Sequence, residues 1–365
     1  MPKVHWLPIE SIEPKKKHLA SQHSSLSFFK ELLAAKRQQG LNPEVIYVHT
    51  GWGLGTFLRD IFPKAKIVAY SEWWFNLHSE DFTFDVNNSH IDHSLETRLA
   101  MVLRNKDFSY ELINSDAIIA PTVWQKSQLP SIFQKKCHVI FDGIDADFYK
   151  PGHPSIHKID QLKDFPATAK ILTYATRGLE PYRGFPEFVS AAEYLLKNDE
   201  SWHIVIAGQD KINYHKSKAA PHDGYGAHAM AHFSKLGFRD RVHMVGSLPL
   251  SSYLILLQSS DLHCYFTRPY VLSWSLLESS LVGCNLIASS TAPVTEFLKP
   301  SDGVHLVDYT SRHLGQQLLD VCLKTSKIDI DRQKANLGAR EYILKIVERK
   351  RCIKNHLDLL NSLLN

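Results

Sequence analysis

Residues 171–196 read ILTYATRGLEPYRGFPEFVSAAEYLL, and this stretch decides the fold. The short apolar run at 171–175 predicts a buried strand. The pattern from Phe185 to Leu196 predicts a helix, and a turn that holds two glycines joins the two elements. A buried strand that passes through a glycine-containing turn into a helix is typical of a parallel sheet with helices on its faces.

The same alternation continues on both sides of this stretch. We predict further strands at residues 45–49, 67–70, 115–120, 138–140, 202–207, 242–245, 262–266, 286–289 and 304–307. Helical patterns separate several of these runs, as at residues 250–259 and 275–281. The fold class is therefore α/β, with two Rossmann-like domains built on parallel sheets.

The domain boundaries follow from composition. Residues 150–168 interrupt the alternation and hold three prolines and a glycine, which is typical of a linker. We predict an N-terminal domain at 1–155, a linker at 156–168 and a C-terminal domain at 169–345. The last residues, 346–365, predict a helix that is able to cross back to the N-terminal domain.

Length and composition describe an ordinary globular protein. The 365 residues are 44% hydrophobic and 22% charged, enough for two cores. The net charge of +4 is too small to imply nucleic acid, and it is compatible with anionic ligands or a weak membrane-surface contact. Five widely spaced cysteines predict free thiols. Because no secretory signal and no membrane-spanning run is visible, we expect a cytoplasmic protein, with any membrane contact at the inner face.

Two arginines flank the turn after the strand at 171–175. Arg177 and Arg183 stand six residues apart at the carboxyl end of that strand, where ligands of open α/β sheets bind. A guanidinium stays charged and binds phosphate oxygens in pairs. The two arginines are therefore candidates to neutralise a diphosphate without a metal ion. The alternative is that both are ordinary surface arginines.

A second candidate stretch, residues 265–278, reads YFTRPYVLSWSLLE and leads from a strand into a helix. Free backbone N–H groups at the start of that helix, at Leu272, Ser273 and Trp274, are suited to an anion. Glu278 lies one turn into the helix, where a carboxylate can hold the vicinal hydroxyls of a ribose. The alternative for Glu278 is a surface glutamate.

Together these motifs resemble the C-terminal domain of glycosyltransferase family 4, whose members are retaining enzymes of GT-B fold. The resemblance places Arg177 and Arg183 at the family's Arg and Lys before a glycine. Glu278 matches the second acid of the family's Glu-x7-Glu motif. The first acid, which contacts the donor sugar in the family, falls on Tyr270. Residues 289–297, SSTAPVTEF, resemble the family's small-residue loop, with Glu296 at the acid position.

The N-terminal half resembles the same family more loosely. Residues 49–55, HTGWGLG, resemble the family's glycine-rich loop, which implies donor binding by Gly51, Trp52 and Gly53. Residues 114–125, NSDAIIAPTVWQ, resemble the strand before the acceptor-side helix. Residues 139–151, VIFDGIDADFYKP, resemble the segment before the interdomain linker.

A separate motif, SEWW, follows the strand at 67–70. Family members often carry a histidine here that reaches the donor sugar, and the register places Glu72 at that position. Glu72 is a candidate catalytic residue that hydrogen-bonds the sugar or supports the developing positive charge. Trp73 and Trp74 are candidates for an apolar face under a sugar ring, and His49 is a candidate to face the cleft. The alternatives are core aromatics, an interdomain salt bridge and a structural histidine.

The resemblance implies a glycosyltransferase that moves a sugar from a nucleotide-diphosphate sugar, a UDP or GDP sugar above all, to a glycan or lipid-linked acceptor in polysaccharide biosynthesis. The two sheets are expected to face a cleft. We see no Asp-x-Asp motif that would hold a divalent metal, so we expect a metal-independent enzyme without a cofactor. Two alternatives stay open: a catalytically inactive nucleotide-sugar-binding subunit, which Tyr270 favours, and a GT-B epimerase that acts on the nucleotide sugar.

Residues 211–232 have poor periodicity and predict a loop with one weak helix. They hold four histidines, His215, His222, His228 and His232. The last two are four residues apart, as metal ligands on one face of a helix are. Because no glutamate stands between them to complete a zinc motif, we prefer the interpretation as solvated loop histidines.

Overall fold

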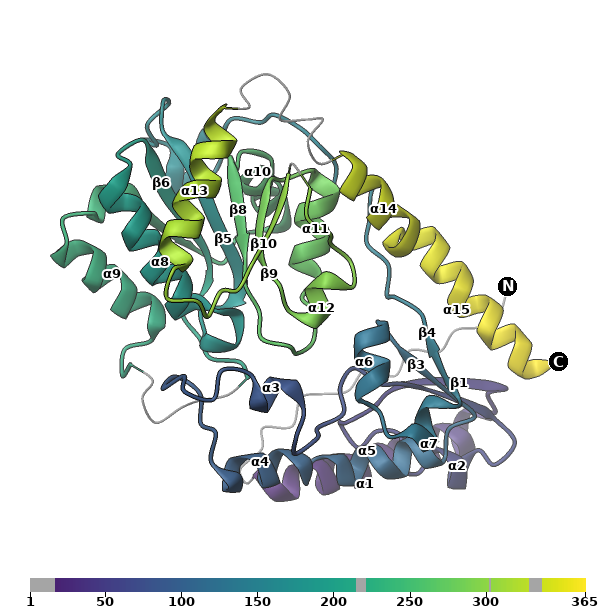
Figure 1. Cartoon of the computed structure of the whole chain (residues 1–365). Coiled ribbons are helices and arrows are strands. Elements are labelled where there is room, and N and C mark those ends of the chain that lie inside the picture. Colours follow the sequence, from purple (N-terminus) through teal and green to yellow (C-terminus); the bar gives the residue numbers. More distant parts are fainter. Residues whose placement is uncertain (1–16, 215–220, 302, 328–336) are drawn as a thin grey trace. The chain divides into compact units, whose positions relative to one another are not determined.

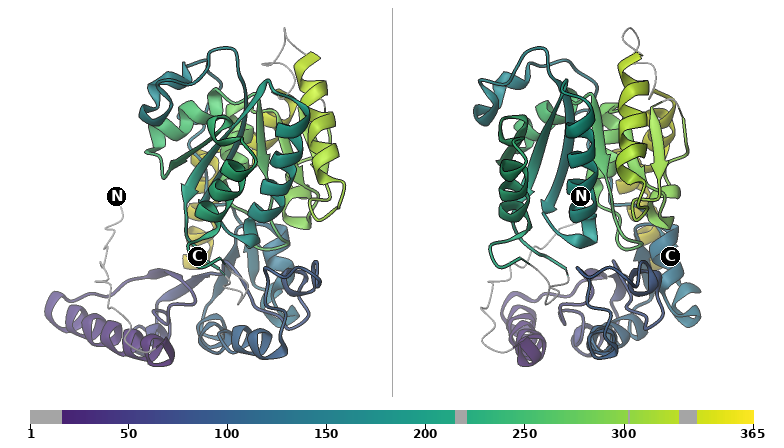
Figure 2. Two further views of the ribbon diagram at one scale, coloured as in Figure 1. Left: turned by 90° about the vertical axis from the view of Figure 1, so that its left-hand side faces the viewer. Right: turned by 60° about the vertical axis from the view of Figure 1, so that its left-hand side comes forward.

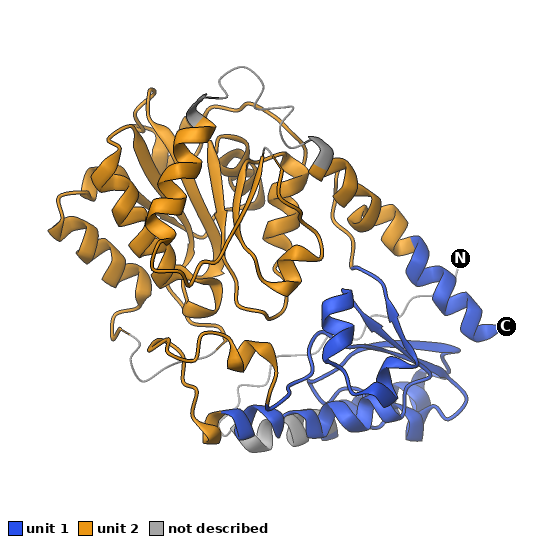
Figure 3. Cartoon of the chain, in the orientation of Figure 1, with its two compact units in different colours: residues 1–77, 98–141, 354–365 blue, residues 78–97, 142–353 orange. Residues whose placement is uncertain are grey.

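The computed structural model describes residues 17–214, 221–301, 303–327 and 337–365 (Figure 1). The chain divides into two compact units, which Figure 3 colours separately. The N-terminal unit comprises residues 1–77, 98–141 and 354–365, and the C-terminal unit comprises residues 78–97 and 142–353.

The N-terminal unit is built on a four-stranded parallel sheet in the order β1-β2-β3-β4. Its strands are β1 (Val45–His49), β2 (Lys66–Tyr70), β3 (Ala117–Ala120) and β4 (Cys137–Val139). The two central strands are buried on both faces, since Val68, Ala69, Ile118 and Ile119 have no exposed surface. Continuous apolar runs of this kind are what a doubly covered parallel sheet requires.

The two faces of this sheet are covered by different segments. The helices of the unit are α1 (Lys17–Gln39), α2 (Leu58–Ile61), α5 (Asn105–Ile113), α6 (Val123–Gln128) and α7 (Ser131–Gln134). Leu112 of α5 packs with Ile118 on one face. On the other face Leu359, from the last residues of the chain, packs with Ile119. Leu359 therefore anchors the last residues of the chain to the core of this unit.

The C-terminal unit contains a six-stranded parallel sheet in the order β10-β9-β8-β5-β6-β7. Its strands are β5 (Lys170–Gly178), β6 (Trp202–Gln209), β7 (Val242–Gly246), β8 (Leu262–Tyr265), β9 (Leu286–Ser289) and β10 (Val304–Val307). From β5 the chain adds β6 and β7 on one side, then returns and adds β8, β9 and β10 on the other. The strand order thus reverses between β5 and β8, which makes this the topological switch point of the sheet.

Helices cover both faces of the six-stranded sheet (Figure 2). The helices that follow β5 in this unit are α8 (Phe185–Asn198), α9 (Tyr225–Lys235), α10 (Leu250–Gln258), α11 (Trp274–Val282), α12 (Ala292–Thr295), α13 (Leu314–Lys327) and α14 (Leu337–Val347), with 3-10 turns η3 (Pro181–Arg183) and η4 (Arg239–Arg241). The largest core cluster lies under α8, α9 and α13 and includes Phe188, Phe233 and Leu318. A final helix, α15 (Arg349–Leu364), contributes residues to both units.

The predicted linker has its own packing within the C-terminal unit. Residues 156–168 carry two 3-10 turns, η1 (Ile156–Lys158) and η2 (Asp160–Leu162). Ile159 and Leu162 are each 1% exposed and pack in one cluster with Ile171 of β5.

All five cysteines of the chain are buried free thiols. Among the described residues, the helices are too short or too polar to cross a bilayer.

Residues 78–97 follow β2 in sequence but pack with the C-terminal unit. They hold α3 (Glu80–Thr83) and the start of α4 (Leu95–Val102). Arg268, which has no exposed surface, donates hydrogen bonds to the carbonyl oxygens of Asp81, at 3.2 Å, and Phe84. The Phe84 ring in turn stacks on Tyr309 at 5.7 Å between centroids. The buried guanidinium thus anchors this segment to the loop after β8.

Candidate active site

The turn between β5 and α8 is shaped by buried groups. Gly184 has a φ of 63°, and a Cβ atom there would lie 2.6 Å from Cβ of Phe266, so this position requires glycine. Glu180, 1% exposed, accepts hydrogen bonds from the backbone N–H groups of Asn213 (2.8 Å) and Tyr214 (3.0 Å). Burial raises the pKa of the Glu180 carboxyl, and the two amide donors oppose the rise. Glu180 therefore ties this turn to the segment after β6.

Arg183 lies inside the unit, with 6% of its surface exposed. Its Nη1 donates to Oγ1 of Thr267 at 2.8 Å and to the carbonyl oxygen of Val271 at 3.0 Å, and its Nη2 donates to the hydroxyl of Tyr214 at 3.1 Å. These acceptors are neutral, and among the described residues no carboxylate forms an ion pair with Arg183, although Glu180 attracts it at longer range. A buried cation without a paired anion favours the binding of an anionic ligand.

Both predicted arginines lie over the same aromatic ring. The guanidinium carbon of Arg183 is 5.1 Å from the centroid of Tyr214, and that of the exposed Arg177 is 5.9 Å from it. Tyr214 packs against Tyr182 at 5.8 Å and against Tyr270 at 5.2 Å. The structure thus brings Arg177, Arg183 and Tyr270 together around Tyr214, a residue that the sequence motifs do not mark.

The start of α11 is partly satisfied by the protein itself. The Oγ atom of Ser273 accepts the backbone N–H of Ser275 at 3.4 Å and caps the helix. The N–H of Ser273 donates to the hydroxyl of Tyr265 at 3.0 Å. Leu272 is buried, whereas Trp274 is 49% exposed. A phosphate at this helix start would therefore use the remaining first-turn amides.

Arg183 and the start of α11 line one recess at the carboxyl ends of β5 and β8. The walls of the recess are Tyr174, Ala175, Thr176, Arg183, Cys264, Tyr265, Phe266, Ser273 and Ser275. This is the switch point of the sheet, outside which open α/β folds bind their ligands. The recess itself leaves no room for a water molecule, so the candidate anion site lies at its mouth, where two stretches that are almost a hundred residues apart in sequence meet.

Glu278 lies in a separate environment, among tyrosines. Tyr149 and Tyr253 lie beside its carboxyl, and their rings pack edge to face with centroids 6.4 Å apart. Burial raises the pKa of the Glu278 carboxyl, and the two phenols oppose that rise. Glu278 is not among the residues that line the recess. Its described neighbours are hydroxyl groups, and the same chemistry suits the hydroxyls of a ribose.

In the N-terminal unit, three side chains meet at the carboxyl ends of β1 and β2. Oε2 of Glu72 lies 3.8 Å from Nε2 of His49, and both side chains are about half exposed, at 51% and 43%. Nε1 of Trp52 lies 3.2 Å from Nδ1 of His49, and Trp52 is 65% exposed. Gln125, which follows β3, donates to the backbone carbonyl oxygen of Glu72 at 2.6 Å. This edge thus presents an aromatic ring, an imidazole and a carboxylate side by side.

The two tryptophans after Glu72 lie in different surroundings. Trp73 is 4% exposed, and its ring lies 6.3 Å from that of Trp124. Trp74 packs against Phe133 at 5.6 Å, within the core under α7. The aromatic surface that this edge offers to a ligand therefore belongs to Trp52 and not to the SEWW motif.

The glycine-rich loop after β1 is held by a buried carboxylate. Glu111 of α5 is 2% exposed; its Oε2 accepts the N–H of Gly51 at 2.8 Å and its Oε1 accepts that of Gly55 at 2.7 Å. Gly51 has a φ of 93°, and a Cβ atom there would lie 2.4 Å from Phe108. Gly53 also requires a positive φ, of 76°. The Gly51 amide is thus engaged inside the unit, and sequence patterns gave no sign of Glu111, which lies in an ordinary helix.

The described part of the histidine-rich stretch does not gather its histidines into a metal-binding cluster. The predicted helix within it is α9, which begins at Tyr225, and His215 lies outside the described residues. His222 lies 3.1 Å from the carboxylate of Asp223, and Nε2 of His232 lies 2.6 Å from Oε2 of Glu193. In the part of the chain that the structure describes, no group of three or more His, Cys, Asp or Glu side chains is arranged to hold a metal ion.

Two short Asp-x-Asp sequences do occur in the chain. One, at 329–331, lies outside the described residues. In the other, Oδ1 of Asp145 accepts the backbone N–H groups of Asp147 (3.1 Å) and Phe148 (3.0 Å), and Oδ2 of Asp145 lies 3.1 Å from Nη1 of Arg349. Asp145 is therefore engaged in a turn and an ion pair.

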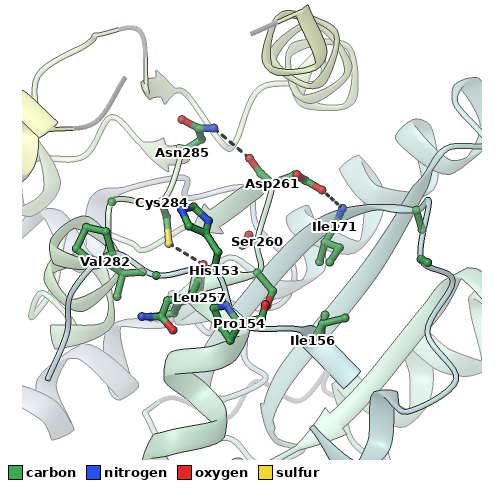
Figure 4. A pocket seen from close by; sticks show the side chains of 17 residues that line it. His153, Pro154, Ile156, Ile171, Leu257, Ser260, Asp261, Val282, Cys284 and Asn285 are labelled. Atoms are coloured by element: carbon green, nitrogen blue, oxygen red, sulfur yellow. Dashed lines mark hydrogen bonds between the residues drawn. The ribbon is translucent and has the colours of Figure 1, made fainter. Parts of the chain in front are cut away.

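A larger pocket, of about 320 Å³, opens at the opposite edge of the same sheet (Figure 4). It lies at the amino ends of β5, β8 and β9, and its polar side chains already bind within the unit. Oδ2 of Asp261 accepts the N–H of Ile171 at 2.7 Å, and Sγ of Cys284 lies 3.3 Å from the carbonyl oxygen of Leu257. Because open parallel sheets bind substrates at the carboxyl ends of strands, we place the candidate site at the smaller recess.

Comparisons with known families cover most of the chain. Residues 13–149 match the profile described as "Glycosyl transferase family 4 group", and residues 156–339 match the profile described as "Glycosyl transferases group 1". The recess lies within the second match and the glycine-rich loop within the first. A comparison with curated protein sequences returns no match.

Solved structures share the architecture across nearly the whole chain. Sucrose-phosphate synthase from Thermosynechococcus elongatus superposes with a TM-score of 0.70 at 16% identity, over 97% of this chain and 80% of that one. A glycosyltransferase from Rickettsia africae gives 0.69 at 14% identity, over 98% and 85%. HepE from Anabaena, solved in complex with UDP-glucose, gives 0.65 at 16% identity, over 92% and 82%. The predicted α/β fold, with two Rossmann-like parallel sheets of GT-B type, is confirmed.

Proposed function

The chain belongs to the glycosyl transferases group 1 family, and from this premise we propose that it moves a sugar from a nucleotide-diphosphate sugar to a glycan or lipid-linked acceptor with retention of anomeric configuration. We propose a role in polysaccharide biosynthesis, in the cytoplasm and in weak contact with the inner face of the membrane. UDP and GDP sugars are the proposed donors. The complex of HepE with UDP-glucose supports testing UDP first.

The observation that carries the proposal is the buried positive charge of Arg183 in the recess at the switch point. A diphosphate at the mouth of this recess would supply the anion that Arg183 lacks among the described residues. Arg177 is exposed and shares the Tyr214 ring with Arg183. We assign direct contact with the diphosphate to Arg177, and to Arg183 the electrostatic field behind the recess. Arg183 itself already donates three hydrogen bonds to acceptors within the protein.

In the proposed reaction the bond between the anomeric carbon and the diphosphate oxygen breaks, and the sugar passes through an oxocarbenium-like state. The acceptor hydroxyl attacks from the same face, and its proton passes to the departing diphosphate. Arg177, Arg183 and the first-turn amides of α11 stabilise the charge that grows on the leaving group, so no metal ion is required. Glu278 holds the ribose hydroxyls, and Glu72 hydrogen-bonds the sugar or supports its developing positive charge.

A second candidate function is nucleotide-sugar binding without transfer. Tyr270 favours it, because this position carries a phenol that packs on Tyr214 and Tyr182 where the family motif has a carboxylate. A phenol can donate and accept one hydrogen bond each but cannot balance a developing positive charge at neutral pH. The two functions share the donor site and differ in turnover.

A thermal-shift screen against UDP, GDP, ADP and CMP sugars tests the donor site that both functions share. Consumption of the donor, measured with and without candidate acceptors, then tests for turnover. We expect one nucleotide class to stabilise the wild type and Arg177→Ala to abolish that shift. Arg312→Ala, which removes an exposed arginine of the same unit, is the control. If no nucleotide stabilises the protein, both functions are wrong. If nucleotide binds but no donor is consumed with any acceptor, the binding function replaces the enzymatic one.

A further inference from the structure

Tyr214 contacts both arginines of the candidate site. The guanidinium carbon of Arg177 lies 5.9 Å from the centroid of its ring, and that of Arg183 lies 5.1 Å from it. The Tyr214 hydroxyl also accepts a hydrogen bond from Nη2 of Arg183 at 3.1 Å. Because the face of an aromatic ring is electron-rich, it attracts a cation placed over it. One side chain therefore interacts with both positive charges.

The two guanidiniums depend on this ring to different extents. Arg183 is 6% exposed and also donates to Thr267 and Val271, so its position does not depend on Tyr214 alone. Arg177 is exposed, and among the described residues its guanidinium forms no hydrogen bond or ion pair. A long side chain in water has many rotamers, and like charges repel each other. Without the ring, Arg177 would therefore spend much of its time away from Arg183.

Tyr214 is itself held by buried groups of the turn between β5 and α8. The backbone N–H groups of Asn213 and Tyr214 donate to Oε2 of Glu180 at 2.8 and 3.0 Å. This segment lies directly on the end of β5, since a Cβ atom on Gly178 would be 2.1 Å from Nδ2 of Asn213. The ring of Tyr214 packs on that of Tyr182, which is 4% exposed, with centroids 5.8 Å apart. Backbone and ring are thus both fixed.

We propose that Tyr214 is a positioning residue of the donor site, and that its ring holds the guanidinium of Arg177 beside that of Arg183 so that both charges act on one diphosphate. Because the arrangement is formed in advance, binding does not have to order a long exposed side chain. The role rests on the proposed function in that the anion is the diphosphate of the donor. Tyr214 acts through Arg177 and does not itself bind the phosphate.

Titration of the full chain with inorganic pyrophosphate, UDP and GDP, followed by phosphorus NMR up to millimolar concentration, tests this role. We expect Tyr214→Leu to weaken pyrophosphate and the nucleotide that binds alike, by about fivefold, as the loss of a cation–π contact would. Tyr214→Gln, which also lacks a ring, should behave in the same way and replaces the leucine variant if that one does not fold. Tyr214→Phe keeps the ring and should bind nearly as the wild type does. Tyr342→Leu, which removes a 48% exposed tyrosine of the same unit, is the control and should change neither affinity.

A double-mutant cycle with Arg177 separates positioning from other roles of the ring. Because the ring acts through Arg177, Tyr214→Leu should have little further effect in the Arg177→Ala background, and thermal unfolding checks that each variant is folded. A ring that stacked on the base of the nucleotide would give a different result. Its loss would weaken the nucleotide in both backgrounds and leave pyrophosphate unchanged.

Three results overturn the positioning role: the variants without a ring bind pyrophosphate like the wild type, Tyr214→Phe loses as much affinity as they do, or the losses of Tyr214→Leu and Arg177→Ala add. Failure of the proposed function has a different signature. In that case neither UDP nor GDP binds the wild type, while pyrophosphate still binds and still requires the ring. If pyrophosphate does not bind the wild type either, both the function and the positioning role are wrong.

Discussion

Replacing Asp81 by Asn should stabilise the C-terminal unit at neutral pH. Asp81 is 1% exposed, and burial raises its pKa from 3.8 to about 6, although the hydroxyl of Ser79 and the charge of Arg268 both favour the ionised form. The ionised carboxylate is thus disfavoured in the folded unit even with a buried guanidinium close by. Asparagine keeps an oxygen that can accept from Ser79 and cannot ionise.

The magnitude and sign follow from the difference between the folded and unfolded pKa values. A rise from 3.8 to about 6 corresponds to about 3 kcal/mol. Because the folded state binds the proton more tightly, Asp81 contributes its full stability below about pH 4, and this contribution is lost as the pH rises through about 6. At pH 8 the free energy of unfolding of Asp81→Asn should therefore exceed that of the wild type by up to about 3 kcal/mol.

Urea unfolding at pH 4 and pH 8, followed by tryptophan fluorescence, measures this difference. The difference in the free energy of unfolding between Asp81→Asn and the wild type should be large at pH 8 and small at pH 4. Glu80→Gln, which removes an exposed carboxylate at the adjacent position, is the matched control and should show a gap near zero at both. Equal stability of Asp81→Asn and wild type at pH 8 would refute the reasoning, as would a gap that does not depend on pH.

Three further predictions concern the donor site. Gly184→Ala should destabilise the protein by about 3 kcal/mol, because a φ of 63° is strained for alanine and the new Cβ atom would clash with Phe266. Gly237→Ala is the control: its φ is 79°, but no atom lies within 4 Å of the new Cβ atom, so it should cost less. Thermal unfolding compares the two variants. Arg177→Ala should lower kcat/KM by about 30- to 1,000-fold, or about 2–4 kcal/mol, and an unchanged value would remove this residue from the diphosphate site. Burial raises the pKa of Glu278, so on acidification its carboxylate is protonated at a higher pH than an ordinary glutamate is, and nucleotide affinity should begin to fall there. Calorimetry should show no such pH dependence in Glu278→Gln.

Local patterns predicted the strands because each is a short apolar run bounded by turn residues, and the run at 45–49 coincides with β1. They also predicted that Arg183 follows the carboxyl end of β5, but they did not predict that its side chain is buried. Its acceptors Thr267 and Val271 lie 84 and 88 residues further along the chain, and their approach depends on the pairing of β5 with β8. Glu111 is 60 residues from Gly51. Two polar residues so far apart in the chain produce no periodic pattern that would indicate their contact. Sequence motifs therefore identify one partner of such a pair at most.

The two glycine-containing turns illustrate what these distant partners decide. After β5 the turn holds a buried guanidinium, Arg183, and a buried carboxylate, Glu180, whereas after β1 the buried charge behind the loop is the carboxylate of Glu111. Both turns contain glycines, yet of the two it is the β5 turn that adds a buried guanidinium, and burial keeps solvent from screening these charges. The buried guanidinium therefore favours a diphosphate at the β5 turn over the β1 turn. This difference in buried charge is the physical reason for which the proposed reaction places the nucleotide diphosphate at the C-terminal unit.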